Sequence, residues 1–104
     1  MTNDHLTAVL AERVMGWRIT PDRFLTGSRG WMPRWKFQPT KNVKDAFRLL
    51  DAATPEEYSV GADANGDFSV RVRIGAVSAQ ALDKSKPRAI CRAVAAAYGI
   101  KVDL

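Results

Sequence analysis

A chain of 104 residues can bury one hydrophobic core but not two, so residues 1–104 are expected to form a single domain. The charged fraction of 26% and the apolar fraction of 46% are ordinary for a globular protein, and no run approaches the ~18 consecutive apolar residues of a membrane span. The net charge of +5 favours an anionic partner, and the single cysteine excludes an internal disulfide. Because the N-terminus lacks the pattern of a secretory signal, we expect a cytoplasmic protein without a membrane partner.

The first predicted element is a helix that begins near Thr2 or Asn3, either of which can cap it. Gly16 supplies the left-handed residue that would close the helix. Between these ends, apolar side chains recur at steps of three and four residues, which is typical of a helix with one buried face. These side chains are Leu6, Val9, Leu10, Val14 and Trp17.

Residues 18–41 hold three of the five prolines and two of the seven glycines, so a long helix is excluded there. Short strands are expected around residues 23–25 and 31–37. The same segment carries the whole charge excess, since it contains six basic side chains and a single acidic one, Asp22. A local field of one sign attracts anions. The basic side chains are Arg18, Arg23, Arg29, Arg34, Lys36 and Lys41.

A second helix should begin after Pro39, with Thr40 or Asn42 as its cap. It should end near Thr54, because Pro55 disfavours helical geometry in the residue before it. Its predicted buried face consists of Val43, Ala46, Phe47 and Leu50.

A β-hairpin is predicted next, from two alternating runs at residues 58–62 and 68–74. The connector contains Asn65 and Gly66, a pair favoured where both turn residues have positive φ. Residues 76–85 fit either a short helical turn or a loop.

A third helix should begin at Lys86 or Pro87 and end at Gly99. Its predicted face consists of Ile90, Ala93, Val94 and Ala97. Beyond it, Ile100, Val102 and Leu104 alternate with polar residues and could add an edge strand, which a homo-oligomer would cover. Together the elements predict an α/β (α+β) fold, a layered α-β-α sandwich in which a small, mainly antiparallel sheet packs against three helices.

No metal or catalytic site is predicted. Residues 63–67 resemble the start of a calcium loop, but Phe68 and Ile74 occupy the places that need a glycine and a bidentate acid. His5 is expected in a solvated first turn, and Cys91 is expected to be a packed thiol. No pattern brings these two together as a nucleophile and its base, and no cofactor motif is found.

Six side chains are candidates for binding an anionic ligand. An indole among arginines suits base stacking and phosphate contact. Two of the arginines alternate with Val70 and Val72 in the predicted hairpin, so their face is either open to solvent or a shallow positive groove. Trp17 and Trp35 are assigned to the core, whereas Trp31 is equally compatible with a loop and a ligand anchor. The candidates are Arg18, Arg29, Trp31, Arg34, Arg71 and Arg73. The hypothesis requires that they converge on one accessible patch.

Three motifs in order along the chain resemble the phage ABA sandwich domain family. They are LAERVMGW at residues 10–17, WKFQPT at residues 35–40 and RAICRA at residues 88–93. The resemblance implies a layered domain of phage or prophage origin that acts in the cytoplasm of an infected bacterium. It implies no established activity and supplies no catalytic residues. The basic insert around residues 29–31 departs from the family pattern.

The sequence therefore favours a non-enzymatic phage accessory protein that binds an anionic small molecule, with sequestration of a nucleotide signal in counter-defence as the concrete form. A nucleic-acid-binding module and a protein–protein inhibitor of a host factor are the alternatives. A single nucleotide needs a concave site, whereas nucleic acid needs a continuous basic track.

Overall fold

The computed structural model describes residues 2–27 and 29–101. These residues contain three helices and six strands, with one short 3-10 helix, η1, between β3 and α2. In chain order the elements are α1 (Asn3–Arg13), β1 (Arg18–Ile19), β2 (Arg23–Leu25), β3 (Trp31–Pro33), η1 (Arg34–Lys36), α2 (Val43–Ala52), β4 (Glu57–Ala62), β5 (Phe68–Ile74), β6 (Val77–Asp83) and α3 (Lys86–Ala97).

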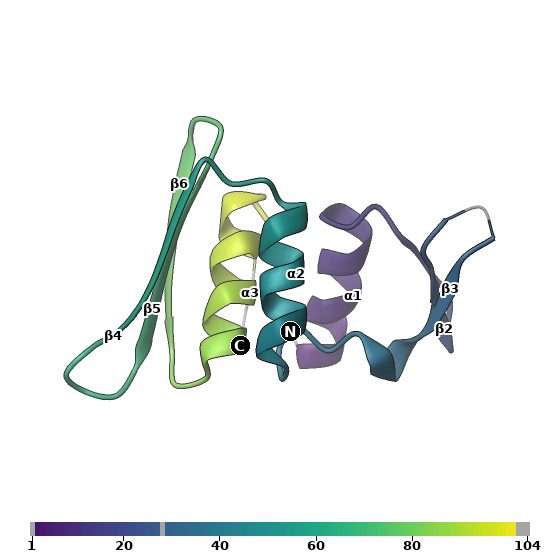
Figure 1. The fold of residues 1–104 in the computed structure, drawn as a ribbon, viewed down its shortest axis with the longest axis horizontal. Coiled ribbons are helices and arrows are strands. Elements are labelled where there is room, and N and C mark those ends of the chain that lie inside the picture. Colours follow the sequence, from purple (N-terminus) through teal and green to yellow (C-terminus); the bar gives the residue numbers. More distant parts are fainter. Residues whose placement is uncertain (1, 28, 102–104) are drawn as a thin grey trace.

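The strands form two antiparallel three-stranded sheets, in the orders β1-β2-β3 and β4-β5-β6. Figure 1 shows the three helices lying between the sheets, which occupy opposite ends of a molecule 44 Å long. The predicted α+β class, the three helices and the antiparallel pairing are confirmed. The strands divide between two sheets, where the sequence had indicated one. No helix within the described residues is long and apolar enough to cross a membrane.

Each helix begins where a polar side chain accepts a hydrogen bond from the backbone of its first turn. Thr2 Oγ1 accepts from the His5 N–H at 3.1 Å, and Asn42 Oδ1 accepts from the Asp45 N–H at 3.2 Å. At α3, Ser85 Oγ accepts from the backbone N–H three residues later. Such caps each contribute about 1 kcal/mol, and they fix the predicted starts.

The core lies where α3 packs against β5, β6 and α2. Val43 was predicted to be buried in α2, but it is 39% exposed, and the buried face of this helix instead includes Leu49. The reason is a rotation of the apolar stripe about the helix axis, which brings consecutive Leu49 and Leu50 toward the core. Fully buried members of the core include Leu6, Leu10, Ala46, Leu49, Leu50, Val70, Val72, Ile90, Cys91 and Val94.

An aromatic cluster joins the β1–β3 sheet to the helices. The Trp17 ring centroid lies 5.7 Å from that of Phe24 and 5.0 Å from that of Phe37, in tilted and edge-on arrangements. Trp17 is buried, as predicted. Trp35 is 67% exposed, so its assignment to the core is wrong. The expected strand at 31–37 ends at Pro33, and the turn of η1 directs Phe37 into the core in place of Trp35.

The segment at residues 76–85, expected to be a helical turn or a loop, contains strand β6. Its half-buried side chains, Ala79, Ala81 and Asp83, alternate with exposed Gln80 and Leu82. Two of these inward residues are alanines, which pack less apolar surface than β-branched residues do and leave the period-two pattern faint. This segment is extended because it pairs with β5, and not because of its own sequence pattern.

The hairpin between β4 and β5 is confirmed, with a different turn from the one expected. Asp63 Oδ1 accepts hydrogen bonds from the N–H groups of Asn65 and Asp67, both at 2.9 Å. Gly66 has a φ of +84°, but Asn65 does not have positive φ. The loop is therefore held by a carboxylate that binds the backbone. In the expected edge strand at the C-terminus, Ile100 is buried outside any strand, and Val102 and Leu104 lie outside the described residues.

Candidate ligand-binding site

The register of the β1–β3 sheet places a row of side chains across its outer face. Arg18 of β1 is opposite Leu25 of β2, which is opposite Trp31 of β3. Directly opposed residues of antiparallel strands share a face, so these three side chains project from the same side of the sheet. Arg23, two residues before Leu25, lies on this side too. The other side carries Phe24, which is fully buried.

These residues line a hollow of about 410 Å³, together with Arg29 and the glycines at 27 and 30. Trp31 is 57% exposed, which makes its indole available to a ligand. Arg18 and Arg29 are exposed, and neither forms an ion pair with any other described residue. We call this hollow the outer-face site and define it by Arg18, Arg23, Leu25, Arg29 and Trp31.

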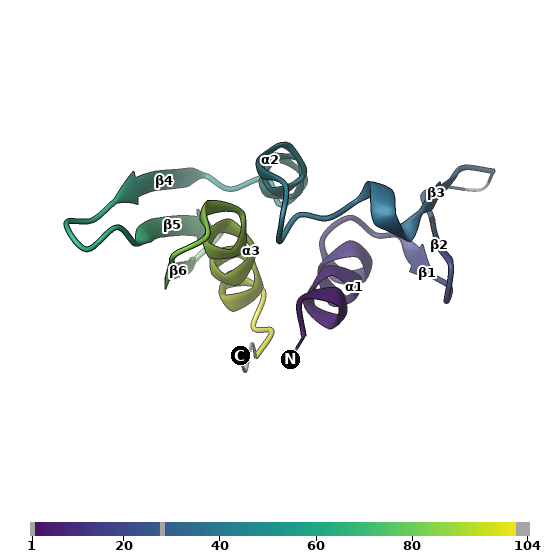
Figure 2. The same cartoon turned by 90° about the horizontal axis from the view of Figure 1, so that it is seen from below.

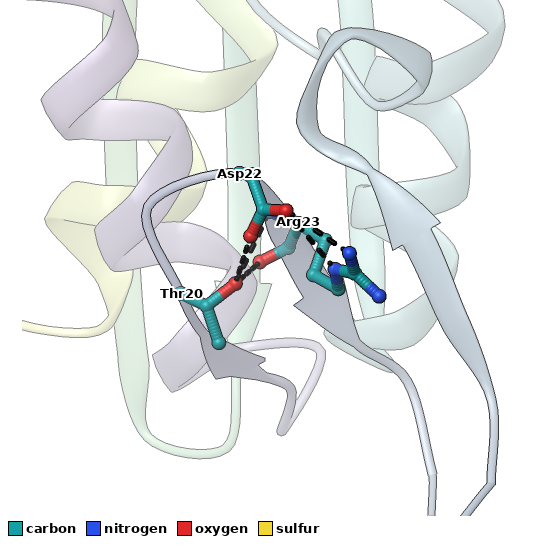
Figure 3. Close-up of polar contacts among 3 residues, drawn as sticks. All are labelled: Thr20, Asp22 and Arg23. Atoms are coloured by element: carbon teal, nitrogen blue, oxygen red, sulfur yellow. Dashed lines mark hydrogen bonds and ion pairs between the residues drawn. The ribbon is translucent and has the colours of Figure 1, made fainter.

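Arg23 is held in place by its neighbours. Its Nε and Nη2 donate to Asp22 Oδ2 at 3.3 and 3.0 Å, as Figure 3 shows. Thr20 Oγ1 lies 3.0 Å from Asp22 Oδ1 and 2.9 Å from the Arg23 carbonyl oxygen, and it accepts from the Arg23 N–H. The hydrogen bonds from Arg23 and Thr20 lower the pKa of Asp22 below its ordinary value.

The guanidinium of Arg23 also lies over the Trp31 ring, with its carbon 4.6 Å from the ring centroid. A cation within about 6 Å of an indole centroid is attracted by the negative face of the ring. One face of Trp31 is therefore occupied by Arg23. A planar ligand that stacks on the indole would therefore use the other face.

Arg34 directly follows β3 but lies on the other side of the β1–β3 sheet. It lines a separate hollow of about 480 Å³ between α1, η1 and residues 37–41. Its guanidinium carbon is 5.5 Å from the centroid of Phe24, the residue that projects from the inner side of the sheet. Asp4 and Lys41 also line this hollow, so its charge is mixed.

Arg71 and Arg73 belong to the second sheet, at the far end of the molecule (Figure 1). They project from the face opposite the buried Val70 and Val72, as predicted. Arg73 is neutralised by Glu56 at 2.9 Å and Glu57 at 3.3 Å. Arg71 is exposed and forms no ion pair within the described part of the chain. A shallow hollow of about 360 Å³ adjoins both, but one of its two cations is already paired with carboxylates.

The predicted convergence of six side chains on one patch is therefore wrong. The structure brings together Arg18, Arg29 and Trp31, and it separates them from Arg34 and from the pair on β5. Arg71 and Arg73 are separated from the site because the strands divide into two sheets with helices between them. Arg34 is separated because it lies over Phe24, on the other side of the β1–β3 sheet.

Two observations concern nucleophilic and metal-binding groups. Cys91 is fully buried on α3, and burial raises the pKa of its thiol far above the ordinary value. A thiol held in this state is a poor nucleophile. Among residues 2–27 and 29–101, no group of three or more His, Cys, Asp or Glu side chains is placed to hold a metal ion.

Comparison with known proteins identifies a family and a similar solved structure. A family model described as the phage ABA sandwich domain matches residues 8–95. The chain belongs to this family. The structure is similar to the 2.0 Å crystal structure of a phage protein from Bacillus cereus ATCC 14579, with a TM-score of 0.81 and 17% identity. The match covers 99% of this chain and 93% of that chain, and at this identity it establishes the fold alone. No match is found among curated proteins.

Two residues of the outer-face site in this phage ABA sandwich domain were not among the sequence-predicted candidates. Arg23 and Leu25 are two positions apart in β2, so the period of a strand places both on one face. That signal is present in the sequence. The register that sets Leu25 between Arg18 and Trp31 is not, because β1 is only two residues long and was not predicted.

Proposed function

We propose that this phage protein binds a nucleotide on the outer-face site without catalysing a reaction on it. The observation that carries the proposal is the row across β1–β3, where an exposed indole lies among three arginines at a concave surface. The other exposed tryptophan, Trp35, lies near Arg34 and beside the mixed-charge hollow.

The chemistry of the site matches the two halves of a nucleotide. Stacking of a base on an aromatic ring contributes about 1–3 kcal/mol, and it suits the free face of Trp31. Arg18 and Arg29 are available for phosphate oxygens, which arginine can bind through two parallel hydrogen bonds. Arg23 sits between the indole and Asp22, so it can contribute positive charge while keeping the ring in place.

A small ligand is favoured over nucleic acid because the basic side chains do not form one track. Arg34 lines a hollow with Asp4, and Arg73 at the opposite end is paired with two glutamates. A nucleic-acid strand that tracked a surface would need successive unpaired cations along it. The outer-face site offers one stacking ring and one cluster of arginines, which is enough for a single nucleotide.

Binding without turnover would act by sequestration. A phage protein of this kind, present in the cytoplasm of an infected bacterium, would lower the free concentration of a nucleotide signal and so weaken a host defence that depends on it. Inhibition of a host protein stays a prediction from the sequence, without a feature of the structure that favours it.

Isothermal titration calorimetry with a panel of linear and cyclic nucleotides tests the proposal. We expect at least one nucleotide to bind, and we expect Arg18→Gln to weaken it by about tenfold, since a charge-assisted hydrogen bond contributes about 1.5–3 kcal/mol. The control is Arg71→Gln, which removes another exposed arginine from the distant sheet and should leave the affinity unchanged. Absence of heat with every nucleotide, for folded protein, would contradict the proposal.

A further inference from the structure

We infer that two copies of this chain associate through strand β4, forming one continuous six-stranded antiparallel sheet. This inference is independent of the proposed function. It begins from the edges of the two sheets, because an unpaired edge strand exposes N–H and C=O groups to any strand that can pair with them.

The other sheet edges in the described residues each carry a feature that hinders pairing at one or more positions. In the first sheet, β1 has two residues, and β3 has three and ends in Pro33, which lacks an N–H. At the C-terminal end of the β6 edge, Arg92 Nη1 donates to the Leu82 carbonyl oxygen at 2.9 Å, and Ile100 lines the same hollow as Leu82. Short strands, proline and a covering side chain all block pairing.

Strand β4 has none of these features. It is six residues long, and residues 58–62 contain no charge and no proline. It forms one edge of its sheet, at the side away from β6 (Figure 2). Gly61 has open space around the position of a Cβ atom and no positive φ, so the strand can accept a side chain at this position.

The apolar face of β4 is also incompletely covered. Tyr58 is opposite Val72, and Val60 is opposite Val70, so both project from the same face as these buried valines. Helix α3 packs against β5 and β6. Tyr58 is nevertheless 51% exposed and Val60 is half-buried. A further strand beside β4 would cover them.

A second copy fits this edge because β4 is complementary to itself. In an antiparallel pair about a two-fold axis through Ser59, Tyr58 is opposite the partner's Val60, and Glu57 is opposite the partner's Gly61. Aromatic and β-branched residues form favourable cross-strand pairs, and every pair in this register joins residues of the same face. Centring the pair on Val60 instead would oppose Glu57 to the partner's Asp63, which two like charges disfavour.

Opposite charges at one position test both the interface and its register. Gly61→Glu places a carboxylate opposite the partner's Glu57 twice per dimer, whereas Gly61→Lys places an ammonium there. We expect sedimentation equilibrium to show a dimer of the wild-type protein at concentrations on the order of 100 µM, as suits an interface smaller than the usual 1,200 Å². Gly61→Glu should weaken association by about tenfold, and Gly61→Lys should not weaken it. Circular dichroism of both variants checks that they fold.

A cysteine on the proposed axis provides a second measurement. Ser59→Cys should form a disulfide-linked dimer under mild oxidation, because its thiol would lie opposite the same thiol of the second copy. The native Cys91 is buried and should not cross-link. Ser78→Cys, exposed on the same face but on β6, is the control and should stay monomeric on a reducing-agent-free gel. A wild-type protein that is monomeric throughout, equal effects of the two Gly61 substitutions, or equal cross-linking at both cysteines would overturn the inference.

Discussion

Arg23 links the indole of the outer-face site to a neighbouring carboxylate, because its guanidinium is bonded to Asp22 and also lies over the ring of Trp31. The ion pair is exposed, with 42% and 68% of the two side chains accessible, so it contributes little to folding stability. Its consequence is geometric. It restrains a flexible side chain against the indole and leaves one face of the ring open.

Asp22 should titrate below its ordinary pKa, and Arg23 should be the main cause. Since the folded-state pKa is depressed, the small contribution of this carboxylate to stability is present above the unfolded value and is lost as the pH falls through the folded pKa. We expect Arg23→Gln to return the pKa of Asp22 toward 3.8 in a carboxyl-carbon NMR titration. A pKa that does not move on this substitution would show that Arg23 is not the cause.

A second carboxylate, Asp83, has a structural role at the junction of β6 and α3. Its side chain is 10% exposed, and it accepts from the Ser85 N–H at 2.9 Å and from Arg92 at 3.3 Å. Arg88 Nε lies 3.6 Å away and is buried without a hydrogen bond. Removing the carboxylate would leave two adjacent guanidiniums with no anion.

We therefore expect Asp83→Ala to lower the free energy of unfolding by about 2 kcal/mol, less than a fully buried pair would cost because both guanidiniums are partly solvated. Urea denaturation measures the change. Asp51→Ala is the matched control, since Asp51 is exposed on α2 and forms no ion pair within the described residues. Its effect should stay within about 0.5 kcal/mol. Equal effects of the two substitutions would contradict this role for Asp83.

At the scale of elements, the β1–β3 sheet depends on the aromatic cluster for its attachment. Its strands have only two or three residues each, so their own hydrogen bonds cannot make the sheet stable alone. Phe24 supplies the buried contact, with its ring 5.7 Å from Trp17 and 6.0 Å from Phe37. The outer-face site therefore depends on a side chain that projects from the opposite side of the same strand.

Phe24→Ala should lower the free energy of unfolding by about 3–5 kcal/mol, because it removes a fully buried ring and leaves a cavity. Trp35→Ala deletes a larger but 67% exposed ring from the neighbouring η1 and should change stability by less than about 1 kcal/mol. Thermal or urea denaturation compares the two. A small effect at Phe24 would mean that the sheet is held by other contacts.

The elements that sequence could predict were those with local signals. Caps mark the starts of the three helices, glycines mark the ends of α1 and α3, and Pro55 marks the end of α2, while strict alternation marks β4 and β5. Strand β6 was missed because its inward residues include two alanines, and β1 was missed because two residues carry no period. Both strands form by pairing with a neighbouring strand, and the local sequence carries no signal of that pairing.

The candidate site was predictable only in part for a related reason. Arg18, Arg29 and Trp31 could be proposed from charge and composition, and the structure does bring them together. Composition cannot say that Arg34 lies over Phe24 on the other side of the sheet, or that helices separate Arg71 from the rest. These are consequences of long-range packing.

At the scale of the whole molecule, the net charge of +5 resides in residues 18–41, so an anion approaching the protein is attracted to the end that holds the β1–β3 sheet. Binding of one nucleotide should weaken modestly with rising salt, with a slope fixed by the charge of that ligand. For single-stranded nucleic acid the slope would grow with each phosphate contacted, by about 0.7 per phosphate. Titrations of a mononucleotide and of oligonucleotides at several salt concentrations distinguish the two, and a slope that grows with oligonucleotide length would favour nucleic acid.

The central claim is that Trp31 and its arginines form the ligand site, and a matched pair of tryptophan variants tests it most directly. Trp31→Phe and Trp35→Phe each remove one exposed indole. The two indoles are matched, because each has a cation over its ring: the guanidinium carbon of Arg23 lies 4.6 Å from the Trp31 centroid, and Nζ of Lys36 lies 5.6 Å from the Trp35 centroid. With a nucleotide that binds the wild-type protein, quenching of tryptophan fluorescence should be lost in Trp31→Phe and kept in Trp35→Phe. Loss of quenching in Trp35→Phe, with full quenching in Trp31→Phe, would contradict the account.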